Sequence, residues 1–157
     1  MQIDILTIFP RFFDEFLQHG MVRVAREQGQ VEISITDLRA FSEDRHRTVD
    51  DRPYGGGPGM LLKPEPVFRA LDLLGLKPGE APPDGTVPLL MCPRGRQLGQ
   101  GDLETFAGAQ RLVILCGRYE GYDERIVEAY PWQRVSLGDY VLSGGEVPAM
   151  AILEGAI

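Results

Sequence analysis

The residues best suited to chemistry stand in one glycine-rich stretch, residues 135–150, which reads VSLGDYVLSGGEVPAM. Two carboxylates, Asp139 and Glu146, lie there among apolar residues and three glycines, Gly138, Gly144 and Gly145. A glycine lets the main chain approach a ligand without a Cβ in the way. The stretch could therefore close a pocket with backbone groups against an apolar wall.

The same stretch is equally compatible with a helix start. Ser143 and Glu146 have the S-x-x-E spacing of a capping box, and Pro148 falls in the first helical turn. Helix N-termini bind polar ligands well, so a helix start and a ligand loop do not exclude each other. Composition alone leaves both interpretations open.

Two further loops could join this stretch in one site. Residues 93–95 follow one apolar run, and GRYEG, residues 117–121, follows another and holds Arg118, Tyr119 and Glu120 between two glycines. In open α/β sheets ligands bind beyond the carboxyl ends of the strands, so three loops that each follow a strand favour a shared pocket. For a single loop, the simpler interpretation is a strand-to-helix turn with Asp123 as the helix N-cap.

Several common site classes lack their motifs. GGGPG, residues 55–59, is followed by Met60 and Leu61 and not by Lys and Ser or Thr, and no G-x-G-x-x-G follows a strand. P-loop hydrolysis and Rossmann dinucleotide binding are therefore disfavoured. With two cysteines and two histidines, a zinc site and a Ser-His-Asp triad are disfavoured as well. Cys92 and Cys116 each end an apolar run, and we expect both to be buried, unpaired thiols.

The elements that must position these loops alternate between strand and helix. Apolar or alternating runs predict strands at residues 2–9, 31–36, 87–91, 112–115 and 132–137. Helical spacing predicts helices at residues 12–19, 21–28, 63–74, 97–106, 123–130 and from 147 onward, with a long loop at 38–60 and a linker at 75–86. The alternation predicts an α/β fold, with a mostly parallel sheet and helices on both faces.

Size and charge limit the class of protein. A chain of 157 residues with 43% hydrophobic content is long enough for one domain with one core. The net charge of −7 counts against nucleic acid binding, and the arginines of residues 39–52 are balanced there by acids. No signal peptide and no apolar run of membrane-spanning length occurs, so we expect a cytoplasmic protein that does not bind membranes.

Three motifs and the opening strand together resemble one family. GGGPGM at residues 55–60, GRYEG at 117–121 and SLGDYVLSGGEVPAM at 136–150, preceded by MQIDILTIFP, are similar to the bacterial tRNA (guanine-37-N1)-methyltransferases over essentially the whole chain. The resemblance implies a SPOUT-class fold with a C-terminal trefoil knot, a rare feature that sequence physics alone does not propose. It also implies S-adenosyl-L-methionine as methyl donor, tRNA as substrate, and a homodimer whose subunits share the site, with no other protein partner.

By the same resemblance, the donor lies in the knot. The matching donor-binding positions are Pro93, Gly95, Gly117, Tyr119, Glu120, Gly121, Leu137, Gly138, Asp139, Tyr140, Val141, Leu142, Gly144, Gly145 and Pro148. The positions expected near the target guanosine and neighbouring phosphates are Asp50, Arg52, Gly55, Gly56, Gly57, Pro58 and Gly59.

Methylation of guanine N1 requires a base that takes the N1 proton and hydrogen-bond donors that stabilise the charge at O6. Glu120 is the candidate catalytic residue in this sequence, beside the donor. The magnesium dependence of the family allows a carboxylate-bound Mg²⁺ as a second cofactor, although the acids lack a metal-site spacing.

The resemblance also marks a departure. Members of the family continue into a helical C-terminal domain that helps to grip tRNA and carries the proposed general base, whereas this sequence stops at Ile157 within an apolar helical pattern. We expect residues 1–157 to form the knotted donor-binding catalytic domain and to have little or no methyl transfer alone.

Two alternative functions compete with the methyltransferase. One is a non-catalytic module that binds a nucleotide or polyanion with GGGPG and the basic loop. The other is a metal-dependent phosphohydrolase that uses Asp50, Asp51, Glu120 and Asp139.

Overall fold

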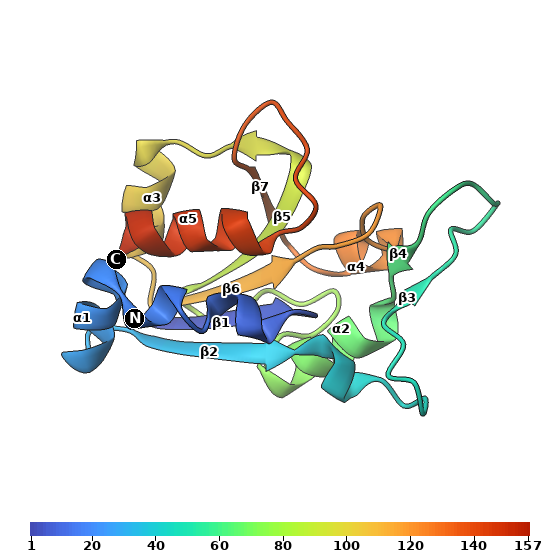
Figure 1. Ribbon diagram of the computed structural model, residues 1–157, viewed down its shortest axis with the longest axis horizontal. Helices are drawn as coiled ribbons and strands as arrows, with labels where there is room; N and C mark the ends of the chain where they lie inside the picture. The colour runs from blue at the N-terminus through green and yellow to red at the C-terminus, as the bar shows by residue number, and fades with distance from the viewer.

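A five-stranded sheet forms the centre of the structure, a computed structural model that describes residues 1–157 (Figure 1). Every neighbouring pair of strands is parallel, which confirms the predicted sheet type. The strand order is β2-β1-β6-β5-β7. The strands are β1 (Gln2–Thr7), β2 (Glu32–Asp37), β5 (Thr86–Gln97), β6 (Arg111–Cys116) and β7 (Gln133–Ser136).

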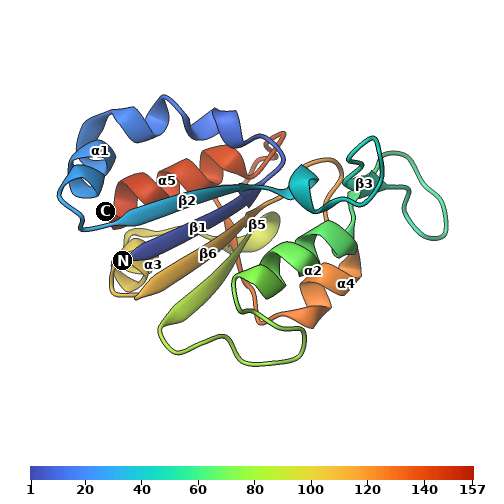
Figure 2. The same ribbon diagram turned by 90° about the horizontal axis from the view of Figure 1, so that it is seen from below.

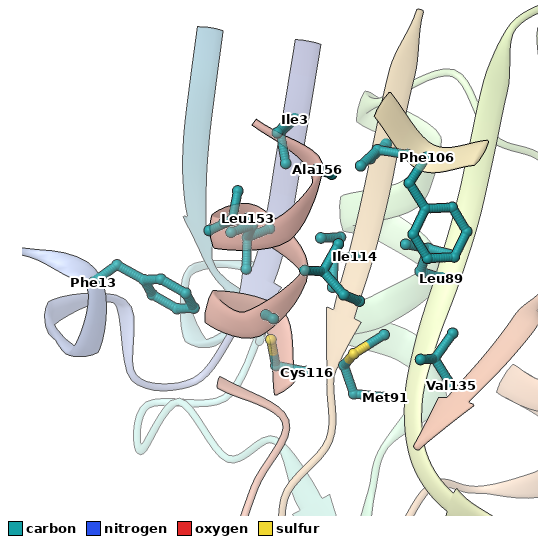
Figure 3. Close-up of a cluster of buried hydrophobic side chains, with 14 of the residues drawn as sticks. Ile3, Phe13, Leu89, Met91, Phe106, Ile114, Cys116, Val135, Leu153 and Ala156 are labelled. Carbon is teal, nitrogen blue, oxygen red and sulfur yellow. The ribbon is translucent and has the colours of Figure 1, made fainter. Parts of the chain in front are cut away.

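Helices cover both faces of this sheet, as predicted (Figure 2). Successive residues of β1 serve the two faces in turn, since Ile3 and Ile5 belong to one buried cluster and Leu6 to the other. The first cluster (Figure 3) receives side chains from α1 (Gly20–Glu27), α3 (Gln100–Ala107) and α5 (Glu146–Ala156). The second cluster receives them from α2 (Pro64–Leu73) and α4 (Glu124–Ala129).

The remaining short elements lie mainly in the long loop and near the N-terminus. β3 (Asp50–Asp51) pairs with β4 (Leu61–Leu62) in an antiparallel hairpin that projects from the body of the molecule (Figure 1). The predicted loop at residues 38–60 otherwise contains only the 3₁₀ turn η3 (Leu38–Phe41). The linker at residues 75–86 contains no helix, as predicted, and its last residue begins β5.

The helix predicted at residues 12–19 is wrong. Two 3₁₀ turns, η1 (Pro10–Phe13) and η2 (Phe16–Gln18), take its place. Phe13 and Leu17 are buried, whereas Phe12 is 47% exposed and so is not a core residue. A four-residue spacing between two buried side chains fits one helix or two successive turns, so the spacing did not distinguish them.

β5 is longer than predicted and absorbs residues that were expected in a loop. It continues through Pro93 and Gly95 to Gln97, with a register shift against β7 between Met91 and Arg96. The start predicted for the next helix at Gln97 is therefore wrong, because Gln97 pairs with Ser136 and α3 begins at Gln100. The apolar run ends at Met91, so the polar extension carried no period-two signal.

Of the smaller predictions, the helix cap is confirmed, whereas the burial of the cysteines is confirmed for only one of the two. Asp123 caps α4, as predicted, and its side chain accepts a hydrogen bond from the Arg125 amide at 3.0 Å. Both cysteines are unpaired, but only Cys116 is buried and Cys92 is half-buried. No helix is long and apolar enough to cross a membrane.

Candidate functional site

Three chain segments converge on one pocket at the carboxyl ends of strands β6 and β7 and beside the middle of β5, which lies between them. About 680 Å³ of space in and at the mouth of the pocket is free of protein atoms, and part of it is open to solvent. Its walls come from residues 91–93 in β5, residues 117–122 after β6, and residues 135–137 and 140–145 with Pro148 around β7 and the start of α5. The three segments that the sequence suggested for a shared pocket thus lie together.

Most of the predicted donor-binding residues line this pocket. The lining includes Pro93, Gly117, Tyr119, Glu120, Gly121, Leu137, Tyr140, Val141, Leu142, Gly144, Gly145 and Pro148. Gly95, Gly138 and Asp139 are not among the lining residues, and Asp139 points to solvent. Gly95 instead lies against β7, where a Cβ would come within 2.5 Å of the Arg134 carbonyl carbon and the Val135 amide nitrogen. That these residues bind the donor stays a prediction.

Tyr122 is a pocket residue that sequence reasoning missed. Its hydroxyl donates to the Met91 carbonyl at 2.8 Å and lies 3.2 Å from the Leu115 carbonyl, so it ties the ends of β5 and β6 together. Burial raises the pKa of the Tyr122 hydroxyl well above its ordinary value, which keeps it a donor. A Cβ on Gly117 would overlap this hydroxyl. The only signal in the sequence was the position of Tyr122 directly after GRYEG.

Arg118 and Glu146 form the main charged contact at the pocket, and neither was among the predicted donor-binding, guanosine-facing or catalytic residues. Glu146 is fully buried in the first turn of α5. Its Oε1 accepts from the Thr7 hydroxyl at 2.7 Å, and its Oε2 accepts from Arg118 Nε at 2.9 Å, with Nη2 also at 2.9 Å. The guanidinium lies 4.7 Å from the centre of the Phe9 ring, in cation–π range.

These contacts make the predicted capping box wrong. The N-cap of α5 is Gly145, and no side chain caps the helix. Glu146 binds Arg118 and Thr7 instead, so that its buried carboxylate meets a full positive charge and a hydroxyl donor rather than one backbone amide. Ser143 lies with its carbonyl oxygen and hydroxyl 3.3 Å from Arg118 Nη1.

The GRYEG loop is joined to the projecting hairpin by backbone hydrogen bonds. The Glu120 amide donates to the Met60 carbonyl at 3.0 Å, and the Leu62 amide donates to the Gly121 carbonyl at 3.0 Å. Tyr119 has a positive φ of 63°, which is uncommon outside glycine. Partial burial and the negative charge of Asp50 in β3 raise the pKa of the Tyr119 hydroxyl. One wall of the pocket is thus built on the hairpin.

The residues predicted to face the guanosine lie on this hairpin, outside the pocket lining. Asp50 lies near Tyr119, and Gly59 lies under the Glu120 side chain, which a Cβ at Gly59 would overlap. Arg52, Gly55, Gly56, Gly57 and Pro58 are exposed in the hairpin loop. The structure brings Asp50 and Gly59 next to the pocket but leaves the others at its periphery.

The residues of this chain do not fit a preformed magnesium site. No three His, Cys, Asp or Glu side chains are placed so that they could hold one ion. Glu120 and Asp139 belong to no such group, and Asp139 is exposed.

Comparison with known proteins places the chain in a family. The family described as tRNA (Guanine-1)-methyltransferase TrmD matches residues 1–157. Proteins named tRNA (guanine-N(1)-)-methyltransferase are similar to this chain over nearly all of its residues. The relative from Microcystis aeruginosa is 49% identical over 99% of this chain and 65% of its own length, and that from Moorella thermoacetica is 46% identical over 98% and 60%. The relative from Geobacillus kaustophilus is 43% identical over 100% of this chain and 62% of its own length.

This chain thus spans about three fifths of the length of these relatives. The match runs through all three segments that line the pocket and through the projecting hairpin. The chain belongs to the tRNA (guanine-1)-methyltransferase family.

Proposed function

We propose that the pocket binds S-adenosyl-L-methionine and that the protein serves in the transfer of its methyl group to N1 of guanosine 37 in tRNA. The observation that carries the proposal is the convergence of GRYEG, SLGDYVLSGGEVPAM and residues 91–93 on one pocket beside the GGGPG hairpin. Membership of the family and the names of the relatives support the reaction type.

The pocket suits a ligand with one flat apolar part and charged polar ends. Leu137, Leu142 and Pro148 supply apolar surface, while nothing lies within 4 Å of the position that a Cβ on Gly121 would take. The Glu120 carboxylate lines the same pocket and suits a positive group. When bound, S-adenosylmethionine supplies an electrophilic methyl carbon on a positively charged sulfur.

We assign Glu120 to the junction between donor and target base. Its backbone is hydrogen-bonded to Met60 of the hairpin, and its side chain lies over Gly59. A carboxylate there can accept hydrogen bonds from the donor edge of a guanine while it faces the donor pocket. The relatives also contain a region that lies outside the match with this chain. We expect the group that takes the N1 proton, and much of the surface that binds tRNA, to lie in a region that corresponds to it.

We also propose the trefoil knot and the homodimer of the SPOUT class. Two contacts support the knot: the Gly145 amide donates to the Gly117 carbonyl at 2.9 Å, and a Cβ on Gly145 would lie 2.7 Å from Cys116 Cα. The chain that leaves β7 therefore crosses the end of β5 to reach β6. Exposed apolar side chains near the pocket, among them Phe12, Val141 and Val147, support a subunit interface there. Sedimentation analysis tests the dimer, and a monomer at all accessible concentrations contradicts it.

Calorimetry with the donor and its demethylated product, S-adenosylhomocysteine, tests the binding function. We expect both to bind one site and to compete, and inorganic phosphate to leave the site unaffected. Tight phosphate binding without binding of either adenosyl compound would instead favour the polyanion-binding module. Leu137→Asp, which places a charge on the apolar wall, should abolish binding of both compounds.

A turnover assay tests whether residues 1–157 bind the donor without transferring its methyl group. The 157-residue polypeptide should bind the donor but show little or no methyl transfer to a tRNA with guanosine at position 37. Robust turnover by residues 1–157 alone contradicts the assignment of the proton acceptor to another part of the protein.

A further inference from the structure

A buried network joins three distant parts of the chain beneath the pocket. Thr7 ends β1, Arg118 follows β6, and Glu146 opens α5, and we refer to them as the Thr7–Arg118–Glu146 network. Thr7 and Glu146 are fully buried, and the Arg118 side chain is only 16% exposed. Both oxygens of the carboxylate have partners in the network, so the charge is buried but compensated.

The network contacts two pocket walls. Arg118 belongs to the wall at residues 117–122, and its Nη1 faces the Ser143 carbonyl oxygen in the wall at residues 140–145. Gly144 lies against the ion pair, because a Cβ there would overlap Arg118 Nε and come within 2.5 Å of Glu146 Oε2. The ion pair therefore contacts both walls.

Stability alone does not explain such a pair. Removing an ion pair from water is expensive, and an apolar pair of similar volume is often as stable or more so. An ion pair can instead fix an orientation, because a guanidinium held through Nε and Nη2 has a fixed plane. Here that plane points the remaining nitrogen at Ser143.

We propose that Glu146 is a positioning residue: through Arg118 it fixes residues 117–122 and 143–145 at the spacing that the methyl donor requires. This inference rests on the proposed donor-binding function. Glu146 itself is not among the residues that line the pocket, so its effect is transmitted through Arg118.

A double-variant comparison separates positioning from stability. Arg118→Met leaves Glu146 buried without its partner and should lower the free energy of unfolding. Adding Glu146→Leu removes the orphaned charge and should restore most of that stability. We expect the affinity for S-adenosylhomocysteine, measured by calorimetry, to fall at least about tenfold in the single variant and to stay low in the double variant.

The chain offers a matched control at the opposite end of the sheet. Asp4 and Arg111 form a similarly buried pair, with Arg111 Nε 2.7 Å from Asp4 Oδ2 and side-chain exposures of 3% and 18%. Arg111→Met and the double variant with Asp4→Leu should reproduce the changes in stability but leave donor-product affinity unchanged. Recovery of affinity together with stability in the Arg118 and Glu146 double variant overturns the proposal.

Amide hydrogen exchange gives a readout that does not depend on the ligand. The Gly145 amide, bonded to the Gly117 carbonyl, should exchange faster in the Arg118→Met and Glu146→Leu double variant than in the wild type or the control. Unchanged protection also overturns the proposal. A wild-type protein that binds no adenosyl compound refutes the donor-binding function, whereas the exchange result still decides whether the network positions these segments.

Discussion

Replacing Gly59 with alanine tests whether the hairpin sets the position of Glu120 in the pocket. Gly59 and Gly56 have nearly the same positive φ, 87° and 84°, so alanine at either position carries the same left-handed strain, roughly 1–2 kcal/mol. A Cβ on Gly56 meets nothing within 4 Å, whereas a Cβ on Gly59 overlaps the Glu120 side chain. Gly56→Ala is therefore a control for strain, and the difference between the variants isolates the displacement of Glu120.

The size of the effect follows from the interaction that is lost. Glu120 is a flexible side chain, so it can rotate away from the new methyl group without unfolding the hairpin. If the displaced carboxylate no longer accepts a charge-assisted hydrogen bond from the donor, binding loses about 1.5–3 kcal/mol. This corresponds to a fall in affinity of roughly 10- to 100-fold for Gly59→Ala. Gly56→Ala should bind with wild-type affinity.

Two measurements on the same samples decide the outcome. Urea unfolding should give the two alanine variants the same stability within about 0.5 kcal/mol, because the strain is shared. Calorimetric titration with S-adenosylmethionine should separate them. Wild-type affinity in Gly59→Ala, or an equal loss in Gly56→Ala, would refute the coupling between the hairpin and Glu120.

Three further substitutions test other local features by urea unfolding. Tyr130→Phe should raise the free energy of unfolding by about 1 kcal/mol, because the buried Tyr130 hydroxyl has no hydrogen-bond partner and the ring keeps its contacts with Phe68 and Trp132; a loss of stability contradicts this. Gly101→Ala should add roughly 0.5–1 kcal/mol, because Gly101 lies in α3 with open space around its Cα, and a neutral result would mean that the helix end is frayed. Asp44→Asn should lower stability at pH 7. Hydrogen bonds from Ser42 and Thr48 lower the Asp44 pKa to about 2, below its ordinary 3.8, so this stabilisation is complete above pH 4 and disappears as the pH falls towards 2. The gap between Asp44→Asn and the wild type should therefore close over that interval, and a constant gap contradicts it.

The sheet was predictable because its strands carry their own signal. β1, β2 and β6 are short runs whose apolar side chains lie on sheet faces that helices cover. Their predicted limits agree with the observed ones within one or two residues. The second half of β5 carried no such signal, because its side chains from Pro93 onward are mostly exposed and it is held in place by pairing with β7. That pairing depends on a segment about forty residues away, which no local pattern records.

The candidate site shows the same contrast between features that follow from local sequence patterns and features that depend on distant residues. The strand-end rule brought the three pocket segments together correctly, since it needs only the positions of the strands. The contacts of Glu146 were out of reach, because its partners Thr7 and Arg118 lie 139 and 28 residues away in the sequence. The S-x-x-E spacing gave a local alternative for Glu146, and the stronger non-local ion pair displaced it.

The glycines in and beside the pocket show why a glycine-rich motif is ambiguous evidence for a ligand. Gly144 makes room for the Arg118–Glu146 pair, Gly117 for the Tyr122 hydroxyl, and Gly95 for the backbone of β7. In each case the space that a Cβ would fill is already occupied by the protein itself. Where segments from three strands must meet within one small volume, glycine is required for their packing before any ligand arrives. Alanine at Gly144 or Gly117 should therefore deform the pocket in the free protein, and a loss of donor affinity in such a variant does not by itself show that the glycine touches the donor.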